Sequence, residues 1–254
     1  MDEPTPDLTV APGPLPPAAP EFGLRKVFLG PSGLRAGWRF GAYVAAFILL
    51  AFLLSFALRP LIPHSKPEDQ PRLWTFLMGE CISFVAALLP AFAMSRFEKR
   101  PFGTYGLPRR GAFGLHFWQG AAWGIVAISL LLLVLRGAGV FYYGTLAIHG
   151  FTALKYAAFW ALLFLMVGLF EEFMIRGYTQ FTLTDGIGFW PAAVLLSCTF
   201  GGLHLRQELA LGDHPRAWSG VLAATFIGLF FCLTLRRTGT LWFAIGMHGA
   251  MLHK

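Results

Sequence analysis

The stretch GLFEEFMIRG at residues 168–177 decides how the rest of this chain can fold and what it can do. From 156–175 every residue is apolar or small except two adjacent glutamates, Glu171 and Glu172. A run of this length can cross a bilayer, where an ionisable side chain is costly and by default marks a functional site. On a helix Glu172 and Arg176 share a face and can pair, whereas Glu171 points about 100° away from Glu172. The pattern predicts one structural carboxylate and one that is free for chemistry; a plain ion pair closing a helix end is the alternative.

The composition is typical of a membrane protein. Of the 254 residues, 56% are hydrophobic and 13% are charged, whereas an ordinary soluble domain has about 25% charged residues. The net charge of +7 fits lysines and arginines collected in loops that face an anionic membrane surface. Because no soluble basic face is left over, nucleic acid is not an expected partner. We therefore predict an all-α, polytopic membrane helix bundle of about seven transmembrane helices.

The apolar runs divide the chain into a tail and a membrane domain. Seven of the 17 prolines fall within the first 20 residues, so residues 1–37 are expected to form a disordered, Pro-rich tail. Residues 38–254 are expected to form one membrane-embedded domain with its motifs in 156–254. The expected spans are 38–58, 73–95, 117–135, the glutamate-bearing run from 156 to about 184, 187–205, 218–235 and a last one from 240.

The distribution of basic residues predicts an orientation. The larger share of the 20 lysines and arginines falls in segments that are cytoplasmic if the N-terminus is cytoplasmic. We therefore expect an integral, multi-pass protein of the cell inner membrane with its N-terminus in the cytoplasm.

Two histidines lie in other apolar runs, His204 near the end of the fifth expected span and His248 in the seventh. If the glutamate-bearing helix continues past Arg176 to about Thr184, a rise of 1.5 Å per residue places Glu171, His204 and His248 about 20, 24 and 14 Å from one membrane face. All three then lie in the middle of a hydrocarbon core of roughly 30 Å. This predicts one polar site; two satisfied packing histidines are the alternative.

A glutamate and two histidines in a membrane cavity suit hydrolysis in two ways. Glu171 can act as the general base that takes a proton from water, while His204 and His248 hold the water and stabilise a developing oxyanion. Alternatively all three could ligate Zn²⁺ and leave a fourth position for water, so the cofactor is either Zn²⁺ or none. The sequence has no HExxH and no GxSxG with a partner, the familiar zinc and serine protease signatures.

Three ordered motifs carry a family resemblance: EExxxR from Glu171, FxxxH ending at His204, and the late His248. Together they resemble the CPBP family, the CAAX-protease and bacteriocin-processing family of intramembrane proteases, which is related to the type II CAAX prenyl endopeptidase. The resemblance covers the chain from about Tyr156 to the C-terminus. The upstream spans are similar only in being membrane helices.

The resemblance implies a role for each motif residue. By it, Glu171 is the base, Glu172 with Arg176 supports it, His204 positions the water and His248 helps to form the oxyanion hole.

One position departs from the family pattern. The third motif usually has Asn, sometimes Asp, four residues after the histidine, and here that position is Leu252. Losing one oxyanion donor typically lowers the rate by about 10²–10³. Either this member is slow, another group replaces the amide, or proteolysis has been lost.

The leading hypothesis is an intramembrane endopeptidase whose partners are the lipid bilayer and a membrane-embedded or lipidated peptide. The alternative is a catalytically weak or inactive family member that acts as a membrane immunity or scaffold protein, which Leu252 favours. A third class is a small transporter or proton relay that uses Glu80 with the glutamate pair, and this needs a continuous polar path through the bundle.

Overall fold

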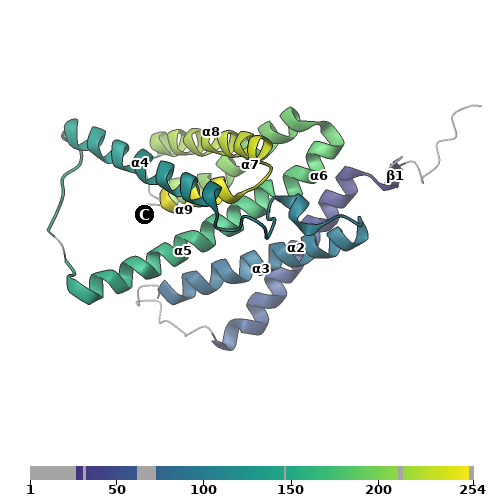
Figure 1. Ribbon diagram of the computed structural model, residues 1–254, viewed down its shortest axis with the longest axis horizontal. Coiled ribbons are helices and arrows are strands. Elements are labelled where there is room, and N and C mark those ends of the chain that lie inside the picture. Colours follow the sequence, from purple (N-terminus) through teal and green to yellow (C-terminus); the bar gives the residue numbers. More distant parts are fainter. Residues whose placement is uncertain (1–26, 31–32, 62–72, 146, 211–213, 252–254) are drawn as a thin grey trace, which may run out of the picture. The chain divides into compact units, whose positions relative to one another are not determined.

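The computed structural model of the chain is an all-α bundle of membrane helices, as the apolar runs predicted (Figure 1). Because lipid offers no hydrogen bonds to the backbone, long apolar runs must satisfy their own peptide groups as helices. The structure describes residues 27–30, 33–61, 73–145, 147–210 and 214–251. Its helices are α2 (Ala36–Leu58), α3 (Leu73–Phe97), α4 (Leu115–Gly137), α5 (Gly150–Arg176), α6 (Tyr178–Ile187), α7 (Phe189–Ala210), α8 (His214–Thr238) and α9 (Trp242–Met251), with short 3-10 turns η1 (Arg59–Leu61) and η2 (Phe102–Tyr105).

Five helical stretches of the described chain are long and apolar enough to cross a membrane, so this is an integral, multi-pass membrane protein. A further apolar helix, Phe189–Leu205, is shorter. The five stretches are Ala36–Leu61, Leu73–Phe97, Leu115–Gly137, Gly150–Ile187 and Ala217–Thr238.

The described part of the seventh expected span is shorter than a membrane crossing. Helix α9 has 10 residues, which makes it about 15 Å long at 1.5 Å per residue. This is half of the roughly 30 Å hydrocarbon core. Leu252, which departs from the family pattern, lies outside the described residues.

The first of two compact units, Met1–Arg35, includes most of the expected tail, of which 1–26 lies outside the described residues. At its end β1 (Leu29–Gly30) pairs antiparallel with β2 (Gly33–Leu34), where the sequence predicted no order. Gly33 has φ 103°, a backbone conformation that glycine adopts without steric cost. These two short strands lie within the segment that was expected to be disordered, and for the rest of the tail the expectation stays a prediction.

Helices α2–α9 belong to the second unit, Ala36–Lys254, in which α9 packs between α4 and α5 through glycines. A Cβ atom added to Gly120 of α4 would lie 2.0 Å from the carbonyl oxygen of Phe243. One added to Gly246 of α9 would lie 2.1 Å from the carbonyl oxygen of Phe117. The two backbones therefore touch, as small residues allow between membrane helices. Gly168 of α5 approaches α9 from another side, so contacts with two helices fix the position of α9.

The glutamate-bearing run stays helical past Arg176 to Ile187, close to the predicted end near Thr184, but it is interrupted once. Helix α5 ends at Arg176 and α6 begins at Tyr178. Between them Gly177 has φ −75° and ψ −113°, outside the helical region. A Cβ atom at Gly177 would lie 2.4 Å from the carbonyl oxygen of Phe173, so only glycine fits there without a shift.

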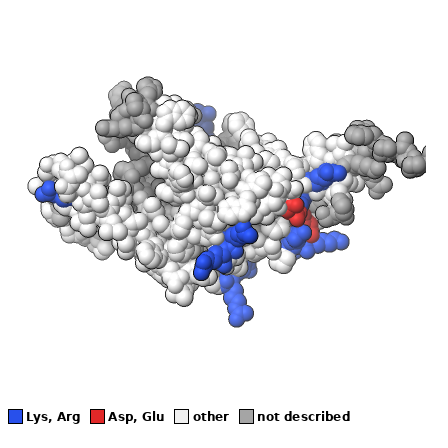
Figure 2. All heavy atoms as spheres, turned by 90° about the horizontal axis from the view of Figure 1, so that it is seen from above, with Lys and Arg blue, Asp and Glu red and all other residues white. Residues whose placement is uncertain are grey.

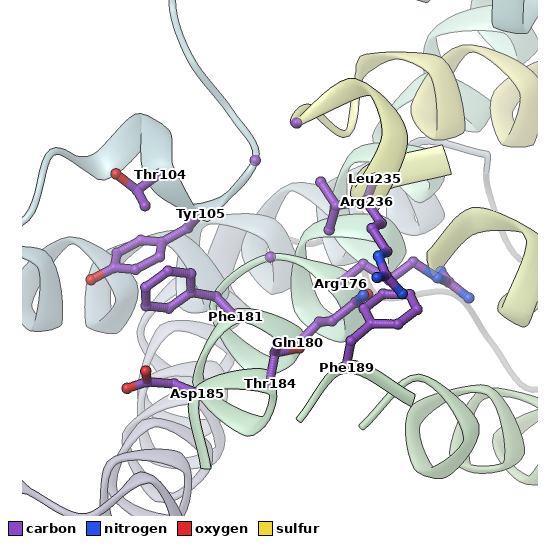
Figure 3. A pocket seen from close by; sticks show the side chains of 13 residues that line it. Thr104, Tyr105, Arg176, Gln180, Phe181, Thr184, Asp185, Phe189, Leu235 and Arg236 are labelled. Carbon is purple, nitrogen blue, oxygen red and sulfur yellow. The ribbon is translucent and has the colours of Figure 1, made fainter. Parts of the chain in front are cut away.

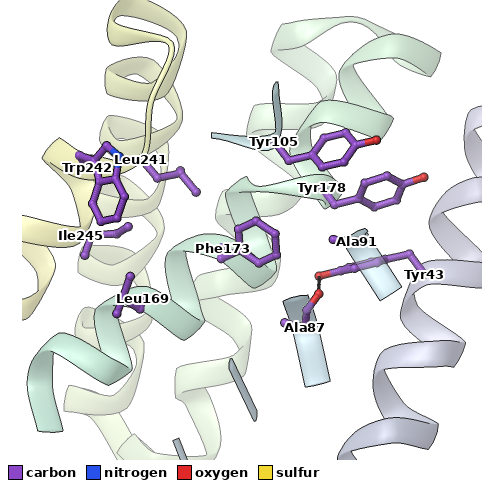
Figure 4. Packing of buried hydrophobic residues seen from close by; sticks show 10 residues of the cluster. All are labelled: Tyr43, Ala87, Ala91, Tyr105, Leu169, Phe173, Tyr178, Leu241, Trp242 and Ile245. Carbon is purple, nitrogen blue, oxygen red and sulfur yellow. Dashed lines mark hydrogen bonds between the residues drawn. The ribbon is translucent and has the colours of Figure 1, made fainter. Parts of the chain in front are cut away.

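The largest buried hydrophobic cluster surrounds this break. Figure 4 shows Phe173 of α5 at its centre, with Tyr43 and Ala87 on one side and Trp242 and Ile245 on the other. The cluster therefore joins α2, α3, α5 and α9 just beside the EExxxR motif.

Glu98, directly after α3, is the centre of a buried polar network, and its side chain is 6% exposed. It accepts hydrogen bonds from Tyr178 at 2.5 Å and from Tyr105 at 3.2 Å. Arg39 Nη1 lies 3.4 Å and Arg100 Nε 3.7 Å from its Oε2. Burial and the Glu98 carboxylate raise the pKa of Tyr105, so this phenol stays protonated and donates. The network fixes the start of α6 against α2 and α3.

Candidate active site

The two adjacent glutamates of α5 lie in different environments. Glu172 is fully buried, and its Oε1 accepts a hydrogen bond of 2.8 Å from Nη1 of the equally buried Arg176. The side chain of Glu171 is 28% exposed, while its Oε2 is buried and has no hydrogen-bond partner among the described residues. One carboxylate is thus held by an internal ion pair while the other remains accessible, as the helical spacing predicted.

The guanidinium of Arg176 is enclosed by α7 and α8. Its Nε donates to the carbonyl oxygen of Gly228 at 3.3 Å. The rings of Phe200 and Phe231 have their centroids 4.6 and 5.3 Å from the guanidinium carbon, close enough for cation–π attraction. Sequence reasoning missed Gly228 and Phe231, because no spacing in the chain distinguishes them from ordinary packing residues of α8.

His248 of α9 connects the two carboxylates. Its Nδ1 donates to Glu172 Oε1 at 2.8 Å, because a carboxylate that already pairs with Arg176 can only accept. Its Nε2 then lies 3.6 Å from Glu171 Oε2. The imidazole-bearing side chain is 9% exposed, and the ring stacks on Phe231 with centroids 5.8 Å apart. With Nδ1 held in this way, Nε2 faces Glu171, the partly exposed carboxylate of the pair.

His204 of α7 lies one aromatic ring away from this group. Its Nδ1 donates to the carbonyl oxygen of Phe200 at 2.8 Å, and the two rings pack with centroids 4.6 Å apart. The Phe200 ring also contacts His248, at 6.1 Å between centroids. Within the described chain, no hydrogen bond or ion pair joins His204 to either glutamate or to His248. The structure therefore brings four of the five predicted residues into polar contact and places the fifth nearby.

A metal ion was one of two predicted ways to use these groups. Among the described residues, no group of three or more histidine, cysteine, aspartate or glutamate side chains is arranged to hold a metal ion. Glu171, His204 and His248 thus do not form a ready ligand set. Zinc dependence stays a prediction, and the chemistry proposed below uses only the side chains of this chain.

A cavity of about 490 Å³ begins at Arg176 and Gly177, within the size range of ligand pockets, about 300–1,000 Å³. Figure 3 shows Asp185 and Tyr105 on one side of it and Arg236 with Phe189 on the other. Gln180 of α6 also lines the cavity; it is 3% exposed, and its Oε1 has no hydrogen-bond partner among the described residues. A buried amide oxygen without a partner is rare and suits a ligand that donates.

Fold and site together define a polytopic membrane protein with a buried ion pair, an accessible glutamate and a histidine between them. Residues 153–251 match the family described as type II CAAX prenyl endopeptidase Rce1-like. The matched part, which includes all three motifs, is similar to this family of CAAX proteases. No curated protein matches the chain, and no solved structure matches it either.

Proposed function

We propose that this protein is an intramembrane endopeptidase that hydrolyses a peptide bond with a water molecule activated by Glu171. The match to a family of prenyl endopeptidases supports a peptidase. The observation that carries the proposal is the position of His248, whose Nδ1 is fixed by Glu172 while its Nε2 lies 3.6 Å from Glu171. A base and an orienting group that converge on one small volume suit the activation of water.

In the proposed first step, a single water molecule forms two hydrogen bonds. It donates one of its hydrogens to the Glu171 carboxylate and its second hydrogen to Nε2 of His248. Glu171 takes a proton, and the hydroxide oxygen forms a bond to the carbonyl carbon of the peptide. The tetrahedral intermediate then collapses, the C–N bond breaks, and Glu171 returns its proton to the leaving amine. Glu172 does not exchange protons, because Arg176 keeps it ionised and His248 needs it as a fixed acceptor.

By the family resemblance, His204 would position the water molecule and His248 would help to form the oxyanion hole. We propose instead that His248 orients the water, since it is the histidine beside Glu171. His204 is then left to contact the substrate or the oxyanion from α7. A kcat loss in His248→Ala that is larger than the loss in His204→Ala would support this assignment.

The proposed substrate is a membrane-embedded or lipidated peptide, with one segment in the cavity that Gln180 and Arg236 line. Asp185 also lines this cavity and bonds to Arg39 near the start of α2. The cavity therefore lies toward the membrane face at which α2 begins. If the N-terminus is cytoplasmic, as the basic residues predicted, the substrate enters from the cytoplasmic face of the inner membrane.

A catalytically weak or inactive family member with an immunity or scaffold role is the second candidate, because Leu252 stands where the family usually has an amide. The two candidates are separated by cleavage of a fluorogenic membrane peptide library by purified wild-type protein and Glu171→Gln, with and without chelator. Cleavage by the wild type alone supports the peptidase. Equal turnover by two folded proteins would end the peptidase proposal, and loss of cleavage with chelator would establish a metal requirement.

A further inference from the structure

A second cavity, of about 500 Å³, lies at the end of α3, and neither Glu171 nor Glu172 lines it. Three of its lining residues are cations, Arg96, Lys99 and Arg100, and two are aromatic, Phe92 and Phe102. None of the described residues that line it is acidic. A concave site with this balance of charge attracts an anion.

The nearest carboxylate does not neutralise this charge. Glu98 faces the buried network, where it accepts from Tyr178 and is only 6% exposed. It offsets part of the positive charge of Arg100, whose Nε lies 3.7 Å from Oε2 of Glu98. Arg96 lies over the ring of Phe92, 4.8 Å from its centroid. Among the described residues no carboxylate forms an ion pair with Arg96 or Lys99.

The backbone at Lys99 is a second, independent observation. Lys99 has φ 55°, the left-handed conformation that ends many helices and that strongly favours glycine. The turn closes α3, with the Arg100 amide donating to the carbonyl oxygen of Ser95 at 2.9 Å. A lysine in a conformation better suited to glycine points to a use for its side chain.

The position of the cavity indicates the kind of anion. Helix α3 is a membrane span that ends at Phe97. Phe92 lines the cavity and is 47% exposed, and Phe97, the last residue of α3, is 68% exposed. The cavity thus lies where the hydrocarbon gives way to headgroups, with apolar surface on one side and cations on the other. Figure 2 shows broad uncharged surface on the face drawn, with Lys and Arg side chains gathered mainly toward one part of it.

We propose that this cavity binds the phosphate headgroup of an anionic phospholipid, with an acyl chain along Phe92. A soluble anion would use the cations but would gain nothing from the exposed phenylalanines, so a lipid fits the site better. The proposal goes beyond the peptidase function and does not depend on it.

The test is lipid retention by the full-length protein in native mass spectrometry, with phosphatidylglycerol compared with phosphatidylcholine. We expect selective retention of phosphatidylglycerol, reduced about tenfold or more in Arg96→Gln/Lys99→Gln, since each basic residue near the headgroups contributes to lipid attraction. Arg109→Gln/Arg110→Gln removes the same charge from exposed residues of the same loop outside the cavity, and it should retain the lipid.

A further variant separates binding from folding. Lys99→Gly removes one cation and also the left-handed lysine, so it should keep or raise the melting temperature while it lowers phosphatidylglycerol retention. Equal retention of the two lipids, or an equal loss in the Arg109/Arg110 control, would overturn the proposal. Displacement of the lipid by millimolar inorganic phosphate would instead identify a soluble anion as the ligand and overturn the lipid assignment.

Discussion

Glu172 and His248, 76 residues apart in the chain, share a hydrogen bond of 2.8 Å between Oε1 and Nδ1. The same oxygen accepts from Arg176 at 2.8 Å. One buried carboxylate therefore fixes both the arginine of its own helix and the histidine of α9. Glu172 positions other groups, while Glu171, one residue earlier and partly exposed, is available for chemistry.

The first prediction concerns Glu171. Glu171→Gln has nearly the same shape but cannot take a proton, so we expect kcat to fall by about 10²–10⁴. The melting temperature should stay close to that of the wild type, because Oε2 of Glu171 makes no hydrogen bond within the described part of the chain. Peptide cleavage measures kcat and thermal unfolding in the same detergent measures the melting temperature. A kcat within twofold of the wild type would contradict the role of general base.

The second prediction is that Glu172→Gln lowers the stability of the protein more than it lowers kcat. Removing one partner of a buried ion pair typically costs about 3–5 kcal/mol, and here it leaves the guanidinium of Arg176 without its carboxylate. We expect a large fall in melting temperature, with kcat reduced only where His248 loses its orientation. The double variant Glu172→Gln/Arg176→Met is the control, because it removes both charges and should recover part of the stability. Unchanged stability in the single variant would contradict the buried pair.

Part of this site could be predicted from the sequence. The Glu172–Arg176 pair follows from the helical repeat alone, since residues four apart are neighbours on any helix. The contact of His248 with Glu172 could not be predicted, because it depends on how closely α9 approaches α5. That distance is set by a glycine contact at Gly168, and residue spacing does not encode it.

The orientation of the His204 ring is a second feature that could not be predicted from residue spacing. Counting the rise along each helix predicted a depth near that of Glu171, but it does not predict the direction in which the ring points. In the structure the ring packs against Phe200 of its own helix. The membrane spans themselves could be predicted well, because lipid forces apolar runs into helices.

The third prediction tests the packing that positions His248. Gly246→Ala would put a methyl group 2.1 Å from a backbone oxygen of α4, so α9 must move. We expect a loss of stability of about 1–3 kcal/mol, as for other overpacked cores, together with a lower kcat. Gly137→Ala is the matched control, because no atom lies within 4 Å of the added Cβ. Equal melting temperatures for the two variants would contradict a tight α4–α9 contact.

The last prediction concerns the cavity beside Arg176. Gln180 lines it and has a buried amide oxygen without a partner among the described residues. If a peptide N–H donates to this oxygen, Gln180→Leu removes one hydrogen bond, which contributes about 0.5–1.5 kcal/mol. We therefore expect KM to rise by about two- to tenfold while kcat is retained. Folding should not suffer, because replacing an unsatisfied buried polar group with an apolar one is neutral or stabilising. Gln119→Leu makes the same replacement on the exposed surface of α4 and should leave KM unchanged. A folded Gln180→Leu protein with the KM of the wild type would mean that the substrate does not reach this cavity.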